Sequence, residues 1–137
     1  MRDALNAIGS RDTALLCVRY ALEKKAYDVL LMDVSDTSSL ADYFVLCTGR
    51  SDTQVQAITQ SVDQNLAQHG VRARSIEGYS TGQWVLIDFA DVIVHVFLEQ
   101  VREFYDLERL WARAPRVTLP EPYLSQARDL RSASAAR

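Results

Sequence analysis

The sequence has few of the residues that build metal, redox or covalent catalytic sites. Only two of its 137 residues are cysteines and two are histidines. Cys17 and Cys47 lie in apolar surroundings, and neither they nor His69 and His95 have a second cysteine or histidine at ligand spacing. The sequence therefore predicts no metal site and no cofactor. Buried free thiols are typical of a reducing compartment, so we expect a cytoplasmic protein.

Motifs for nucleotide binding and hydrolysis are missing as well. There is no GxSxG elbow, no Walker loop and no GxGxxG. No apolar run reaches the ~20 residues that span a bilayer, and residues 1–10 lack the apolar core of a signal peptide. We expect a protein that neither crosses a membrane nor is exported.

The charge that is present is mostly negative, and it is unevenly distributed. The chain has 15 basic and 18 acidic residues, but residues 113–137 contain five arginines and only two acids. The part before residue 113 is therefore acidic. An acidic surface disfavours nucleic acid, so no direct sequence-specific nucleic-acid binding is expected. Two explanations of the acidic surface are equally compatible with the charge: it binds a basic protein partner, or it only keeps the protein soluble.

The apolar pattern predicts one α/β domain with a mixed sheet flanked by helices. Helices are expected over 12–25 and 51–69, strands over 28–34, 43–48, 71–76, 84–89 and 92–98, and a short helical segment or pair of turns over 99–111. The order is αββαβββα. Ser51 and Gln54 have capping-box spacing at the start of the second helix, and only Ala90 and Asp91 separate the last two strands, which predicts a tight hairpin. Residues 1–117 form the expected domain, and 118–137 a flexible tail in which a frayed helix could form.

Two interpretations of the conspicuous polar residues remain open. Asp88 and Asp91, with the helix start at Ser51, could hold Mg²⁺ and a nucleotide for nucleotidyl transfer. The simpler interpretation is that Asp91 makes the turn and Asp88 faces solvent. Trp84 and Trp111, the only two tryptophans, stand near aromatic and charged residues, a composition typical of a protein-binding hot spot but also of a core edge.

Several stretches, read together, resemble the ribosomal silencing factor (RsfS, or Iojap-like) family. They are Thr37-Ser-Ser-Leu-Ala-Asp-Tyr-Phe-Val-Leu-Cys-Thr-Gly49, Ser51-Asp-Thr-Gln-Val-Gln-Ala-Ile58, Gly82-Gln-Trp-Val-Leu-Ile-Asp-Phe89, Asp91-Val-Ile-Val-His-Val-Phe97 and Val101-Arg-Glu-Phe-Tyr-Asp-Leu-Glu-Arg-Leu-Trp111. The similarity covers about residues 11 to 117 in unbroken order. The last stretch is the most specific.

The resemblance implies a nucleotidyltransferase-like fold with a function that involves no catalysis. Family members bind the large ribosomal subunit through ribosomal protein L fourteen and sterically block joining of the small subunit, which represses translation when nutrients are scarce. Organellar relatives serve in large-subunit assembly. A homodimer, and an enzyme that uses nucleotide and Mg²⁺, are the alternatives left open.

The resemblance also suggests which residues bind the partner. The candidates are Trp84, Asp88, Asp91, Tyr105, Asp106, Glu108, Arg109 and Trp111, with the aromatic rings as anchors and the acids meeting basic groups. One departure is visible, because family members often have glycine where this chain has Ala90. Alanine there predicts a different turn type or a strained one.

Overall fold

The computed structural model describes residues 8–106, 109 and 114–135. Its elements are α1 (Ser10–Glu23), β1 (Tyr27–Asp33), β2 (Tyr43–Gly49), α2 (Asp52–Gln68), β3 (Ser75–Glu77), β4 (Trp84–Asp88), β5 (Val92–Leu98), α3 (Glu99–Tyr105) and α5 (Tyr123–Ala135). The predicted order αββαβββα is confirmed, and α5 follows it.

The five strands form one mixed sheet in the order β1-β2-β5-β4-β3. The central pair, β2 and β5, is parallel, and all other neighbours are antiparallel. The predicted hairpin is present, with Asp88 of β4 opposite Ile93 of β5. Because α2, β3 and β4 intervene between β2 and β5, the sheet combines a crossover with hairpins, as the pattern of strands predicted.

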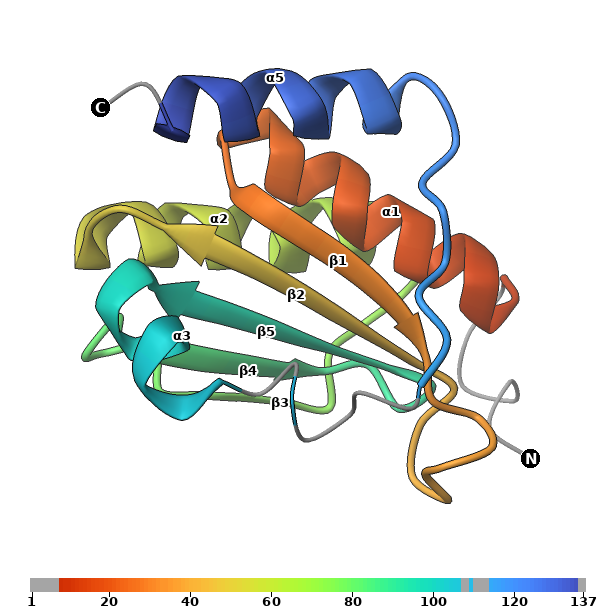
Figure 1. Ribbon diagram of the computed structural model, residues 1–137. Helices are drawn as coiled ribbons and strands as arrows, with labels where there is room; N and C mark the ends of the chain where they lie inside the picture. The colour runs from red at the N-terminus through yellow and green to blue at the C-terminus, as the bar shows by residue number, and fades with distance from the viewer. Residues whose placement is uncertain (1–7, 107–108, 110–113, 136–137) are drawn as a thin grey trace.

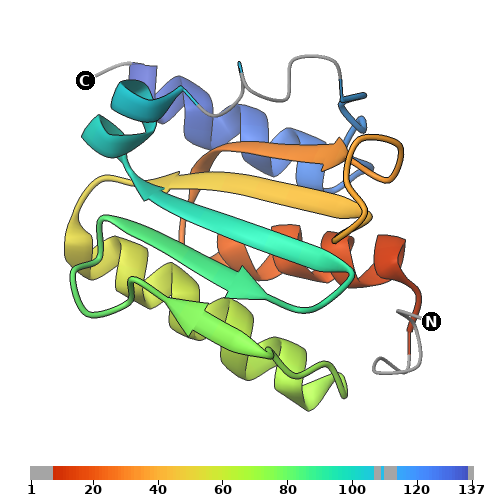
Figure 2. The same ribbon diagram turned by 90° about the horizontal axis from the view of Figure 1, so that it is seen from below.

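The helices divide the sheet into two unlike faces. The three long helices α1, α2 and α5 lie together on one face (Figure 1), where Val18 of α1, Ile58 of α2 and Val94 of β5 belong to the main core. Viewed from the opposite side, the strands lie in front and these three helices lie behind them (Figure 2). We call the side without them the helix-poor face. The short helix α3 sits at the end of the sheet where β2 and β5 finish.

The start of α2 follows from its local sequence. Ser51 is the N-cap, and its Oγ accepts a hydrogen bond from the Gln54 amide at 3.1 Å. The Gln54 side-chain oxygen in turn accepts from the Arg50 amide at 2.7 Å. The predicted capping box is thus present, with the glutamine reaching one residue further back than the standard pattern.

Two expectations about the elements need correction or refinement. The strand expected over 71–76 is only Ser75–Glu77, because the chain joins the sheet late, where the Arg74 amide donates to the Asp88 carbonyl at 2.7 Å. A helical segment was expected over 99–111. In the structure α3 ends at Tyr105, because Asp106 adopts a left-handed conformation with φ 46°. Residues 107–108 and 110–113 lie outside the described part.

The expected tail contains a helix that packs on the domain. Leu124, Ala127 and Leu130 of α5 contact the main core. The division of the chain at residue 117 stays a prediction, but the described part of 118–137 is largely helical. None of the described helices is both long and apolar enough to cross a membrane.

Candidate partner-binding surface

A row of aromatic rings crosses the helix-poor face. Phe44 of β2, His95 and Phe97 of β5, and Trp84 of β4 form this aromatic row. The centroids of Trp84 and Phe97 are 5.0 Å apart, and those of Phe44 and His95 5.3 Å, the latter pair edge-on. Such separations are those of favourable ring pairs. Phe44, His95 and Phe97 are buried, so the row belongs to the packing on this side of the sheet.

His95 sits in the middle of the row as a neutral imidazole. Its Nδ1 accepts a hydrogen bond from the Trp84 indole nitrogen at 3.2 Å. Burial lowers the pKa of His95 from 6.5 to about 4, because a charged ring would lose its hydration. The residue is only 4% exposed. His95 is therefore part of the scaffold of the face.

Two large apolar side chains project into solvent at the two ends of this face. Leu40 lies in the β1–β2 loop and is 75% exposed, and Phe104 of α3 is 80% exposed. The loop and α3 both extend below the sheet at opposite ends (Figure 1). Single exposed apolar residues are ordinary, but an exposed aromatic ring on a rigid helix is a good anchor for a partner.

A hollow with several acids lies beside α3. Its volume is about 280 Å³, and its lining includes Asp28 of β1, Glu99 and Glu103 of α3, and Asp106. We call it the acidic hollow. Burial, with the nearby Glu99 acting in the same direction, raises the pKa of Tyr27 in its wall to about 12, so the phenol keeps its proton. Groups of this kind attract a basic side chain.

Arg102 holds α3 against the sheet. Its Nη1 donates to the Asp28 carbonyl at 2.6 Å and to Thr48 Oγ1 at 2.7 Å. The residue is 9% exposed, although the acidic hollow and a second hollow on the other side of Asp28 both include it in their walls. The buried arginine therefore sets the position from which Phe104 and Asp106 project.

The residues predicted to bind a partner divide between the two ends of the sheet. Trp84 begins β4 opposite Phe97, at the end where α3 starts. Asp106 and Arg109 are exposed at the same end, beyond α3. Tyr105 is the last residue of α3. The remaining two candidates of this group, Glu108 and Trp111, lie outside the described residues.

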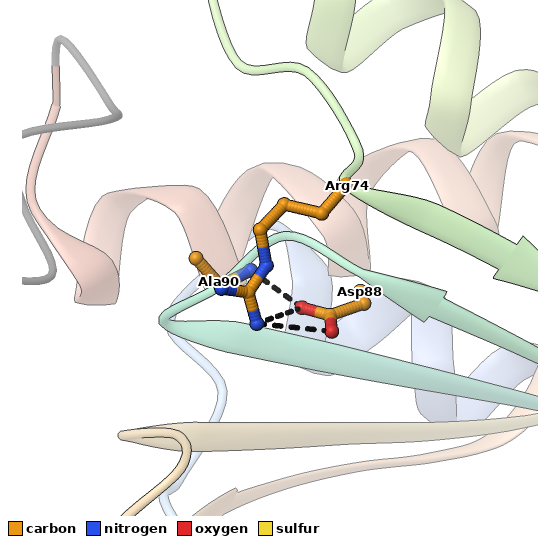
Figure 3. Close-up of polar contacts among 3 residues, drawn as sticks. All are labelled: Arg74, Asp88 and Ala90. Atoms are coloured by element: carbon orange, nitrogen blue, oxygen red, sulfur yellow. Dashed lines mark hydrogen bonds and ion pairs between the residues drawn. The ribbon is translucent and has the colours of Figure 1, made fainter.

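Asp88 lies at the other end and organises the hairpin (Figure 3). Its Oδ1 accepts the Ala90 amide at 2.7 Å, and its carboxylate pairs with Arg74 Nη2 at 3.1 Å. Ala90 has φ 74°, and the Asp91 amide donates back to the Phe89 carbonyl at 3.0 Å. This is the strained turn that alanine predicted in place of glycine. Asp88 faces the turn and Arg74, so the simpler interpretation, which turned it toward solvent, was incomplete.

Asp91 is placed inside the protein. The residue is fully buried, and its carbonyl accepts the amides of Asp42 at 2.8 Å and Tyr43 at 3.2 Å. These bonds tie the β1–β2 loop to the hairpin. In this structure the side chain does not reach the surface, so its part in binding a partner stays a prediction.

The residues invoked for nucleotidyl transfer lie far apart. Because β2 and β5 are parallel, with Tyr43 opposite Val92 and Gly49 opposite Leu98, Ser51 and Asp91 lie at opposite ends of the sheet. Six steps along a strand separate them, or about 20 Å. A nucleotide with Mg²⁺ held jointly at Ser51, Asp88 and Asp91 is incompatible with this arrangement. Within the described part of the chain no three His, Cys, Asp or Glu side chains gather as a metal site requires.

Phe104 and Leu40 are the surface residues that sequence reasoning missed. A helix that continued to residue 111 would place Phe104 on the same side as Val101, turned toward the sheet. Since α3 has only seven residues, Arg102 is the buried residue of the turn and Phe104 points outward. The run Glu103-Phe104-Tyr105-Asp106 contains two acids beside two aromatic residues, which is a sequence signal for an acidic, aromatic patch. Nothing in the sequence indicates that Leu40 is exposed.

The described residues form a small mixed α/β domain with an exposed acidic and aromatic end near α3. Residues 7–137 match the sequence model of the family described as "Ribosomal silencing factor during starvation". The chain is 42% identical to ribosomal silencing factor RsfS of Bacillus subtilis over 97 residues, and this alignment covers 71% of this chain and 82% of that protein. It is 38% identical over 112 residues to RsfS of Halalkalibacterium halodurans, and this alignment covers 82% of this chain and 96% of that protein. A crystal structure of a protein from Chromobacterium violaceum superimposes with a TM-score of 0.75 at 36% identity, covering 77% of this chain and 88% of the other.

The chain therefore belongs to the ribosomal silencing factor family. The resemblance inferred from its motifs is confirmed, and the family match extends over α5 as well. Membership places the protein among ribosome-associated regulators of translation.

Proposed function

We propose that this protein binds the large ribosomal subunit through ribosomal protein L fourteen and sterically prevents the small subunit from joining, which represses translation. It acts in the cytoplasm, and binding to the large subunit also allows a part in subunit maturation. The observation that carries the proposal is Phe104, an aromatic ring 80% exposed on a short, rigidly held helix in a protein of this family.

Phe104 is surrounded by the chemistry that a basic protein surface requires. Glu103 and Asp106 are exposed on either side of it in sequence, and both line the acidic hollow. An anchor ring enters an apolar pocket of the partner while the acids meet lysine or arginine at its rim. Opposite charge also accelerates the encounter, which makes association faster at low salt.

The first experiment is sedimentation of the purified protein with large subunits, small subunits and a mixture of both. The expected result is cosedimentation with large subunits alone and fewer joined ribosomes in the mixture. Binding to isolated L fourteen, measured by calorimetry, tests the partner separately. Cosedimentation with large subunits but no heat with L fourteen would overturn the named contact, and absence from large subunits would overturn the function.

Phe104→Ser tests the surface. Truncating an aromatic hot spot costs about 2 kcal/mol or more, so affinity should fall about 30-fold. Ile76→Ser is the matched control, because Ile76 is also exposed but lies on β3 at the far edge of the sheet. If both variants bind like the unaltered protein, the partner contacts another surface.

Glu103→Lys tests the role of charge. It should slow association and weaken its dependence on salt, whereas Glu77→Lys on β3, the same charge change at an exposed position, should not. Equal slowing by both variants would mean that only the net charge of the protein matters. A homodimer stays a prediction, which analytical ultracentrifugation of the free protein checks.

A further inference from the structure

A second hollow lies along the outer edge of β1, away from the helix-poor face. β1 is an edge strand, and part of its outer side pairs with the segment after α3, where the Asp33 amide donates to the Pro115 carbonyl at 2.9 Å and the Val117 amide to the Leu31 carbonyl at 2.8 Å. Toward Asp28 the same edge borders a hollow of about 340 Å³, closed on its other side by α5. We call it the arginine hollow.

Three arginines from three separate segments line the wall of this hollow. Arg102 comes from α3, Arg116 from the segment paired with β1, and Arg128 from α5. Asp28 is the single carboxylate residue in the lining. Because Arg102 is held by its bonds to the Asp28 carbonyl and to Thr48, its guanidinium is fixed in place before any ligand arrives. The other two arginines are exposed and can close on a ligand.

The remaining wall is apolar. Val29 and Leu31 of β1, Leu119, and Leu124 with Ala127 of α5 line it. A hollow of this volume lies within the size range of small-molecule sites, about 300–1,000 Å³. An apolar wall with three arginines along it fits a ligand that has one strongly anionic end and one flat or apolar end.

We propose that the arginine hollow binds the phosphate group of a small molecule of up to nucleotide size. The guanidinium fork matches the tetrahedral oxygens of phosphate with paired hydrogen bonds. The arginine hollow is a different hollow from the acidic one beside Phe104, although Arg102 lies in the walls of both. The ligand is either inorganic phosphate or a nucleotide. The two differ because only a nucleotide has a base and sugar that can contact the apolar wall.

Calorimetric titration of the isolated protein with inorganic phosphate and with ADP, supported by thermal shift, tests the site without ribosomes. Binding by either probe should weaken at least about tenfold in Arg116→Gln and in Arg128→Gln, the loss expected for one charged hydrogen bond. Arg72→Gln is the matched control, because Arg72 is exposed near β3 at the opposite edge of the sheet. Asp28→Asn, which suits the left-handed φ of 47° at this position, should tighten binding several-fold by removing the opposing charge.

The outcomes separate clearly. Tighter binding of ADP than of inorganic phosphate, lost in the two variants and kept in the control, supports the site with a nucleotide-like ligand. Equal binding with the same variant pattern supports it with free phosphate. Absence of heat and thermal shift with both probes overturns the proposal, as does binding that Arg116→Gln and Arg128→Gln leave unchanged. Since no ribosome is present, neither result depends on the proposed antiassociation function.

Discussion

Replacing Asp88 by alanine should destabilise the protein more than its partly exposed position indicates. The carboxylate does two things, accepting the Ala90 amide at 2.7 Å and pairing with Arg74 at 3.1 Å. A hydrogen bond to a charged group contributes about 1.5–3 kcal/mol, and an exposed ion pair about 0.2–1 kcal/mol. Because both use one carboxylate they are not additive. Asp88→Ala should therefore lower the free energy of unfolding by about 2–3 kcal/mol.

Two further variants separate the contributions. Asp88→Asn keeps an oxygen that can accept the Ala90 amide and loses only the charge, so about 1 kcal/mol should be lost. Arg74 is 55% exposed, and Arg74→Ala should cost less than about 1 kcal/mol, and less still at raised salt. The amide bond to Ala90 is thus expected to dominate, because it holds an alanine in a conformation that favours glycine.

Urea unfolding followed by circular dichroism, at low and at raised salt, measures all three variants. If Arg74→Ala costs as much as Asp88→Ala, the ion pair rather than the turn bond stabilises the hairpin and the reasoning is wrong. Asp88→Asn has a second use in the sedimentation assay. A variant that folds normally but no longer reaches the large subunit would establish Asp88 as a partner contact in addition to its place in the hairpin.

Three other changes have expected outcomes. Ala90→Gly should raise the midpoint of urea unfolding and add about 0.5–1 kcal/mol, since glycine adopts φ 74° without strain; a lower midpoint would refute the strain. His95 has a pKa of about 4 in the folded protein, so it stays neutral at a pH where the unfolded chain takes up a proton. The free energy of unfolding should therefore fall by about 3 kcal/mol as the pH drops from about 6.5 to 4. NMR titration of the imidazole in a His69→Gln background should find this low pKa. Arg102→Met should cost about 3 kcal/mol or more in the same unfolding assay because Thr48 and a backbone carbonyl lose their buried donor; a cost below 1 kcal/mol would refute its anchoring of α3.

The order of elements was predictable because each one is specified locally. Ser51 and Gln54 are three residues apart and bond as a capping box whatever the rest of the chain does. Ala90 and Asp91 are the only residues between two strongly apolar runs, so a hairpin had to form there. The unusual turn was foreseeable too, since alanine occupies a position that favours glycine.

Properties that depend on distant segments were not predictable. The burial of Asp91 arises because the β1–β2 loop packs over it, almost fifty residues earlier in the chain. The exposure of Phe104 follows from the early end of α3, which the left-handed Asp106 sets. The arginine hollow needs α5 to pack beside β1, and the sequence of that helix, rich in serine, alanine and arginine, is also typical of a flexible tail.

The two faces of the sheet are packed differently, and His95 has a low pKa because it is buried on the helix-poor face. The core under α1, α2 and α5 is mainly aliphatic, whereas on the helix-poor face the aromatic row packs beside buried aliphatic side chains such as Met32 and Leu46. A charged imidazole in that row would need hydration and would separate the rings. Since the pKa of about 4 lies well below neutrality, the face keeps one shape throughout the physiological range. Affinity for the large subunit should therefore be constant between about pH 6.5 and 8, and a several-fold change over that interval would mean that a group other than His95 titrates at the interface.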